Sequence, residues 1–168
     1  MDIIASFVVE SRIKLVRHYL KKKKKKNVPI RILTGNYLNI TQPSALYLIK
    51  DILGDKLDLR FYNDTKRSFH AKAYIFEKEN GGEIFIGSSN LSRSAWTSGV
   101  EWNYRIDKTT NYEDFKYFKC MFEELFNNES IIVNDQELER YSKNWKKPKI
   151  YSTIDNSKDD VNYVYDES

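Results

Sequence analysis

The sequence contains few of the residues that define the simplest functional classes. Of its 168 residues, one is cysteine and two are histidine, so one chain can form neither a disulfide framework nor a structural zinc site. No apolar run approaches the length of a membrane span, and residues 1–10 lack the basic region of a secretory signal. We therefore expect a protein of a reducing, cytoplasmic compartment, without membrane attachment, metal or other cofactor.

The charges are unevenly distributed along the chain. Residues 1–150 hold 27 of the 28 basic residues and 19 of the 24 acidic ones, a net charge of +8. A basic body of this size favours a polyanionic partner, nucleic acid before any other. We predict one domain over residues 1–148, followed by an acidic tail or linker over residues 149–168.

Strands and helices alternate in the first part of the sequence, and strands joined by helical crossovers are typical of a layered α/β fold. We therefore predict an α/β/α sandwich with a mixed, mostly parallel central sheet. Proline can open a helix and glycine can close one, so the second helix has signals at both ends. The expected elements are a strand at 2–9, a helix from Ser11, a strand at 28–34, a helix from Pro43 to Gly54 and a strand at 57–62.

The pattern changes after the third strand. An Asn-Gly turn predicts a hairpin of residues 69–76 and 83–88, with a further strand at 100–106. Residues 112–126 form a helix whose apolar stripe is typical of a core-packing face, and a shorter helix spans 135–141. The predicted stripe consists of Phe115, Phe118, Phe122, Leu125 and Phe126.

The residues best suited to ligand binding or catalysis lie on the predicted hairpin. Residues two apart in a strand share a face, so His70 and Lys72 project together, an arrangement that suits a bound anion. Ser88 and Asn90 add a hydroxyl and an amide at the end of the paired strand, and Gly87 permits close approach.

Two further features allow alternative interpretations. Glu101 can accept a hydrogen bond from one nitrogen of His70 and fix its tautomer, or it can simply pair with Arg105. The lysine run 21–26 can bind phosphates, or it can be a solvated helix end favoured by the helix dipole.

The spacing of these residues resembles the signature of the phospholipase D superfamily. His70 and Lys72 match its His-x-Lys pair, and residues 87–90 match its Gly-Ser-x-Asn motif. Glu101 matches the acid that follows this motif in the family's nucleases, whereas Glu77 stands where the family usually has an aspartate of structural role. Residues 2–148 are similar to the N-terminal phospholipase-D-like domain of certain bacterial DEAD/DEAH-box helicases.

The resemblance implies a metal-independent phosphodiesterase, a nuclease acting on DNA. His70 would attack phosphorus and form a phosphohistidine, while Lys72, Ser88 and Asn90 would hold the non-bridging oxygens. Glu101 would complete this catalytic set. Gly87, Ser89 and Arg93 would contact the substrate. In such helicases the ATP-driven motor would follow the tail. No phosphate loop for ATP occurs in these residues, so we expect that this chain alone does not bind ATP through one.

The chemistry requires a second histidine to protonate the leaving oxygen. His18 lies in a basic helix without matching partners, so we expect a homodimer with one composite site. The main alternative is a non-catalytic DNA-binding module that delivers a helicase and retains the phosphate pocket. Lipid hydrolysis is less favoured, since it calls for two motifs in one chain and a membrane-binding segment.

Overall fold

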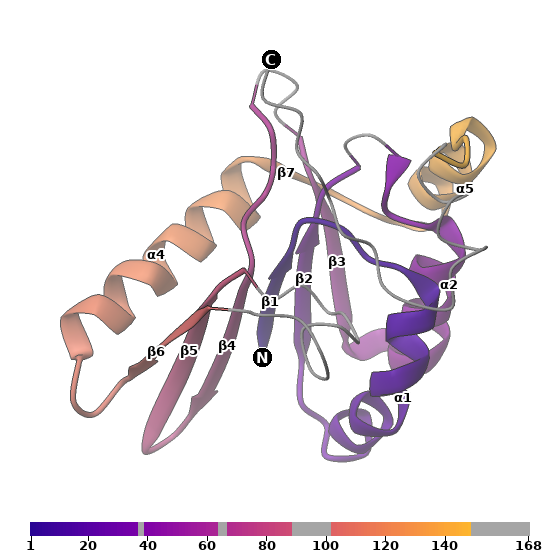
Figure 1. The fold of residues 1–168 in the computed structure, drawn as a ribbon. Coiled ribbons are helices and arrows are strands. Elements are labelled where there is room, and N and C mark those ends of the chain that lie inside the picture. Colours follow the sequence, from indigo (N-terminus) through magenta and orange to yellow (C-terminus); the bar gives the residue numbers. More distant parts are fainter. Residues whose placement is uncertain (37–38, 64–66, 89–101, 149–168) are drawn as a thin grey trace.

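The computed structural model describes residues 1–36, 39–63, 67–88 and 102–148 of the chain. Its described strands form one sheet in the order β6-β5-β4-β1-β2-β3-β7, with helices on both faces (Figure 1). The predicted layered α/β/α sandwich is therefore confirmed. The predicted acidic tail, residues 149–168, lies outside the described residues, so the domain boundary stays a prediction.

The first part of the chain consists of crossovers. Strand β1 (Asp2–Ala5) leads into α1 (Glu10–Lys25), then β2 (Ile30–Thr34), α2 (Pro43–Leu53), the 3-10 turn η2 (Gly54–Lys56) and β3 (Leu57–Tyr62). Strands β1, β2 and β3 pair in parallel, as the alternating pattern predicts. The bounds of α2 agree with its signals: Pro43 opens it, and Gly54 caps it at a φ of 57°, which glycine adopts easily.

The second part adds antiparallel strands on both sides of the parallel trio. Strands β4 (Ala73–Lys78), β5 (Gly81–Gly87) and β6 (Asn103–Asp107) form a meander, and β4 pairs antiparallel with β1. Strand β7 (Ser130–Ile132), which the sequence analysis missed, pairs antiparallel with β3. The prediction of a mostly parallel sheet is therefore wrong: four of the six described pairings are antiparallel, because a hairpin meander needs no crossover.

One face of the sheet is covered by α1, α2 and α5 (Asp135–Asn144), on the right of Figure 1. Alternate residues of the strands supply this core, for example Ile3 on β1 and Ile32 on β2. Helix α2 is buried along its length, which explains its apolar sequence, whereas α1 buries mainly Ile13 and Leu20.

The other face is covered by α4 (Tyr112–Asn128), on the left of Figure 1. Phe115, Phe122 and Phe126 are each at most 2% exposed, so the predicted stripe forms the core contact. The assignment of Phe118 to that stripe is wrong. Its side chain is 37% exposed, because the helical rotation from Phe115 carries residue 118 to the flank of the buried face.

Two predicted element boundaries are also corrected. Strand β1 ends at Ala5, and residues 6–9 continue as a buried connection to α1. The helix starts at Glu10 with Val9 as its N-cap residue, so Ser11 does not cap it. The Glu10 amide instead donates to Oε1 of Gln42 at 2.8 Å, which ties the start of α1 to the start of α2.

Candidate active site

The His70–Lys72 segment lies before β4 rather than within it. Strand β4 begins at Ala73, so the prediction that strand pleating places both side chains on one face is wrong. Phe69 directs the chain instead: it is 8% exposed and stacks on Tyr62, the last residue of β3, with ring centroids 4.7 Å apart. The segment is thus anchored by its aromatic neighbour at the carboxyl end of the parallel strands.

Backbone contacts hold the same segment from two other sides. The hydroxyl of Ser6, just after β1, donates to the carbonyl of Ala71 at 3.4 Å. The amide of Gly87, at the end of β5, donates to the carbonyl of Lys72 at 3.4 Å. These contacts bring residue 88, which follows β5, next to the His70–Lys72 segment.

Two glycines are required by close approach around this segment. A Cβ atom on Gly87 would lie 2.0 Å from the carbonyl oxygen of Trp102 and 2.5 Å from Oδ1 of Asn103. A Cβ atom on Gly35 would lie 3.0 Å from the carbonyl oxygen of Ser6 and 3.2 Å from Phe69. The packing confirms the expectation that Gly87 permits close approach, and it adds Gly35 as a second such position.

Lys72 and His70 are in direct contact. The Lys72 ammonium lies 3.1 Å from Nδ1 and 3.3 Å from Nε2 of the imidazole, and it donates to the His70 carbonyl at 3.1 Å. Lys72 is 6% exposed, whereas the His70 residue is exposed. A buried ammonium group thus approaches an imidazole that solvent or a ligand can reach.

This contact has an electrostatic consequence for the imidazole. Desolvation and the positive charge of Lys72 both lower the pKa of His70 below its ordinary value. Both effects disfavour the imidazolium, because burial and a neighbouring cation each penalise a positive charge. At neutral pH the ring is therefore held in its neutral form, which can act as a nucleophile or as a proton acceptor.

Ser88 and Trp102 are joined by a reciprocal pair of hydrogen bonds. The Ser88 amide donates to the Trp102 carbonyl at 3.1 Å, and the Trp102 amide donates to Oγ of Ser88 at 3.2 Å. The Ser88 hydroxyl accepts this bond with its oxygen, and a hydroxyl can also donate its proton to an acceptor. Trp102 itself is 84% exposed, and the sequence analysis did not identify it as a candidate site residue.

The structure therefore brings together part of the predicted site. His70, Lys72, Gly87 and Ser88 converge where the carboxyl ends of β1 and β5 meet the start of β4. The remaining candidates lie outside the described residues, and their roles stay predictions; they are Ser89, Asn90, Arg93 and Glu101.

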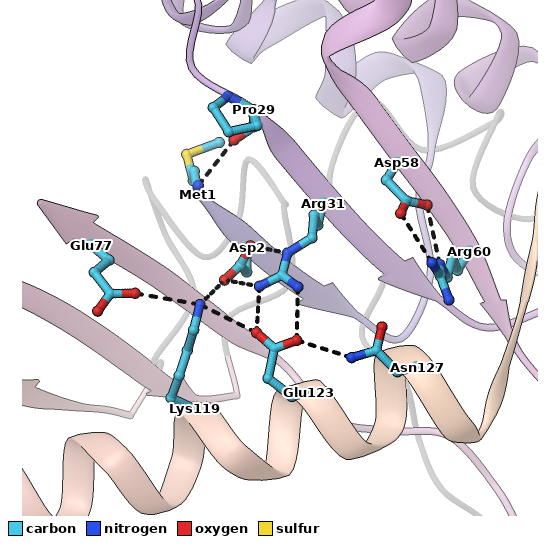
Figure 2. Close-up of polar contacts among 10 residues, drawn as sticks. All are labelled: Met1, Asp2, Pro29, Arg31, Asp58, Arg60, Glu77, Lys119, Glu123 and Asn127. Atoms are coloured by element: carbon cyan, nitrogen blue, oxygen red, sulfur yellow. Dashed lines mark hydrogen bonds and ion pairs between the residues drawn. The ribbon is translucent and has the colours of Figure 1, made fainter.

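The acid at position 77 belongs to a different part of the molecule. Glu77 lies near the far end of β4 and forms ion pairs with Lys108 at 2.6 Å and Lys119 at 3.6 Å. Figure 2 shows Lys119 reaching from α4 toward both Glu77 and Asp2. The hydrogen bond from Lys108 is the main cause that lowers the pKa of Glu77. The contacts of this acid join β4 to the turn after β6 and to α4.

The described residues offer few alternative kinds of site. Within residues 1–36, 39–63, 67–88 and 102–148, no three histidine, cysteine or acidic side chains gather as a potential metal site. None of the helices in this part of the chain has the length and apolarity required to span a bilayer. Within the described part of the site, the groups available for chemistry are His70, Lys72 and the hydrogen-bond donors around them.

Comparison with known proteins gives a family match and a structural match. Residues 2–126 match the family model described as "Cardiolipin synthase, PLD-like domain". A phosphatidylserine synthase from Haemophilus influenzae Rd KW20 has a similar structure, with a TM-score of 0.50 and 15% sequence identity. The match covers 92% of this chain and 39% of that one, so the present chain spans well under half of its structural neighbour. No curated protein matches the sequence.

Proposed function

We propose, from the premise that this chain belongs to the PLD-like domain family, that it is a metal-independent phosphodiesterase that cleaves DNA. The family is associated with phosphodiester-related chemistry, and the observation that carries the proposal is the contact between Lys72 and His70. A phosphodiester is anionic and repels anionic nucleophiles, so a neutral imidazole beside a fixed cation suits the reaction. The lowered pKa of His70 provides that neutral ring.

In the proposed reaction, a ring nitrogen of His70 attacks phosphorus and forms a P–N bond. The bond from phosphorus to the leaving oxygen breaks, and that oxygen takes a proton from an acid on the opposite side. Lys72 and the Ser88 hydroxyl, together with Asn90, stabilise the charge that builds on the non-bridging oxygens. Water then attacks phosphorus and gives a proton to the group that served as the acid. The P–N bond breaks, and both groups are regenerated.

The acid that serves the leaving oxygen requires a second imidazole. His18 is exposed on α1, a helix that packs with α2 and α5 on one face of the sheet, and in the sequence it has no matching partners for this role. We therefore propose that a second copy of the chain donates its own His70 across a two-fold axis, in the protonated form that the anionic phosphate between the two rings favours. Sedimentation at the concentrations used for activity tests this step, and a strictly monomeric active protein would contradict it.

The choice of DNA as substrate is supported by charge. The net charge of +8 on residues 1–150 attracts a polyanion, and the exposed lysines at the end of α1 contribute to it. We also propose that the natural protein continues into a DEAD/DEAH-box helicase motor, on the strength of the sequence resemblance. The lipid-related names of the matched family and structural neighbour describe those proteins. Because of these names, the tests below also measure binding to phospholipid vesicles.

The first test is cleavage of supercoiled plasmid DNA in excess EDTA. We expect the wild-type chain to nick the plasmid, the His70→Ala variant to lose this activity, and the His18→Ala variant to retain it. A nicking activity that survives His70→Ala comes from another site or a contaminant and would overturn the assignment. A wild-type chain that binds DNA but does not cleave it would favour the non-catalytic binding module instead.

A further inference from the structure

Trp102 is the most exposed of the large hydrophobic residues in the described part of the chain, at 84%. A single exposed apolar side chain is common on protein surfaces and needs no explanation by itself. Trp102 differs because of its position: its backbone exchanges two hydrogen bonds with Ser88, which adjoins the His70–Lys72 segment. The indole is thus attached to the rim of the candidate active site by a backbone that is hydrogen-bonded to Ser88.

This attachment limits where the indole can go. The Trp102 carbonyl would lie 2.0 Å from a Cβ atom on Gly87, so the two backbones are in close contact beside the site. Trp102 also immediately precedes β6, which pairs with β5 over residues 103–107. The start of β6 is therefore positioned by the same glycine that contacts Lys72.

We infer that Trp102 is a stacking platform for a nucleobase next to the scissile phosphate, and that the substrate is a single-stranded segment of nucleic acid, of the kind that negative supercoiling opens in a plasmid. This inference rests on the proposed function and deepens it by naming a substrate class. A phosphate held at His70 and Lys72 carries a nucleoside on each ester oxygen, and one of the two bases then lies near the rim. An exposed indole offers that base an aromatic face.

The strandedness follows from the geometry of stacking. Bases inside a duplex are already stacked on their neighbours and paired, so they cannot lie flat on a side chain that projects from the protein. Single-stranded nucleic acids are commonly bound by aromatic side chains that stack on successive bases, beside basic groups that follow the backbone. A glycerophospholipid offers no aromatic ring, so its affinity would not depend on Trp102 in this way.

The test compares two labelled oligonucleotides of equal length and charge in the full chain. One is an oligothymidine, and in the other the central thymines are replaced by abasic sites. Binding is measured by fluorescence anisotropy in the His70→Ala background, which prevents turnover. Without further substitution, the chain is expected to bind the base-bearing strand about 5- to 150-fold more tightly than the abasic strand.

The Trp102→Ala variant is expected to lose this preference and to bind both strands as the abasic one is bound. Trp102→Phe should retain part of the preference, because it keeps an aromatic face. Tyr104→Ala is the matched control: Tyr104 is 60% exposed on β6, two residues farther along the chain from the Ser88 contact, and its removal should leave the preference intact. Equal thermal stability of the variants establishes that the fold is retained.

Several results would overturn the inference. One is the absence of any base preference before Trp102 is changed, and another is a preference that survives Trp102→Ala. A third is that Trp102→Ala loses binding to phosphatidylglycerol vesicles, or loses self-association in sedimentation, while its base preference stays unchanged. Trp102 would then contact a lipid surface or a second copy of the chain instead of a base. Plasmid nicking in EDTA separates this inference from the proposed function, since cleavage can fail while the base preference depends on Trp102, and the reverse.

Discussion

The two ends of strand β1 each have a cation beside a titratable group, and the chemical consequences differ. At the start of β1, Arg31 binds Asp2 at 2.7 Å and Glu123 at 2.7 Å (Figure 2). At the other end, beyond Ser6, Lys72 lies against the imidazole of His70. The first end joins opposite charges, whereas the second places a cation beside a group that becomes a cation on protonation.

Each cation lowers the pKa of its neighbour. Burial acts to raise the pKa of Asp2, but hydrogen bonds from Arg31 and Lys119 outweigh it, so the pKa lies below its ordinary value. The hydrogen bond from Arg31 is the main cause that lowers the pKa of Glu123. For a carboxyl group a lowered pKa favours the charged form and ties α4 to the sheet; for His70 it favours the neutral, reactive form. The same electrostatic effect thus stabilises structure at one end and prepares chemistry at the other.

The largest effect is expected from breaking the ion network. Arg31→Met leaves Asp2, which is 4% exposed, and Glu123 without their shared partner. Removing one member of a buried pair typically costs about 3–5 kcal/mol of folding stability, because the remaining charge is poorly compensated. We expect a loss near the lower end of that range, since Lys119 still contacts Asp2. Urea denaturation measures the loss.

A surface pair provides the control for this substitution. Arg140 pairs with Glu137 on α5, and its side chain is 67% exposed, so Arg140→Met should cost far less stability than Arg31→Met. Equal losses from Arg31→Met and Arg140→Met would contradict the view that the network ties α4 to the sheet.

The next largest effect concerns the site. Lys72→Met removes the cation from the imidazole and should raise the pKa of His70 relative to wild type, so the ring protonates at a higher pH. The neutral fraction, and with it metal-free cleavage, should then be lost at a higher pH as the solution is acidified. Loss of a hydrogen-bond donor to the phosphate should also slow turnover, because removing one such donor typically raises the activation free energy by about 2.7–4 kcal/mol. Titration of the imidazole signals by proton NMR reports the pKa directly.

The chain has two histidines, so His70→Ala assigns the His70 signal in this titration. Lys108→Met is the matched control, because Lys108 pairs with Glu77 at the other end of β4. We expect the pKa of His70 to remain at its wild-type value in that variant. An unchanged pKa in Lys72→Met would show that desolvation alone sets the protonation of the ring.

The elements with local signals were predictable from sequence. Helix α2 begins at Pro43 and is capped by Gly54, and β3 covers residues 57–62, because turn chemistry and apolar patterning act over a few residues. Strand β4 was placed too early, since the stacking of Phe69 on Tyr62 is a tertiary contact. The insertion of β4 beside β1 also joins distant segments, and no local pattern specifies it.

The candidate site shows the same division. The residue types at 70, 72, 87 and 88 indicated an anion site, and the fold brings these residues together. The sequence could not supply the distance between Lys72 and the ring, the burial of the lysine, or the exposure of Trp102. The placement of the His70–Lys72 segment depends on Ser6 and Gly35, which belong to loops after other strands.

The smallest effect is expected from a substitution at Glu77. This substitution is the most sensitive test of whether the two ends of β1 have separate roles. Glu77→Asp introduces the acid that the resembled family usually has at this position. The Glu77 side chain is 40% exposed and pairs with Lys108 and Lys119, so shortening it should cost less than about 1 kcal/mol in urea denaturation. Lys119 keeps its contact with Asp2, which limits the damage.

Metal-free cleavage and the pKa of His70 should both stay at their wild-type values in Glu77→Asp. The ion pairs of this acid join β4 to the turn after β6 and to α4, and its charge lies at the far end of β4 from the imidazole. A drop in cleavage at unchanged stability would mean that position 77 acts on the site through the length of β4. The two ends of the sheet would then be coupled, and the separation of structural from chemical roles would fail.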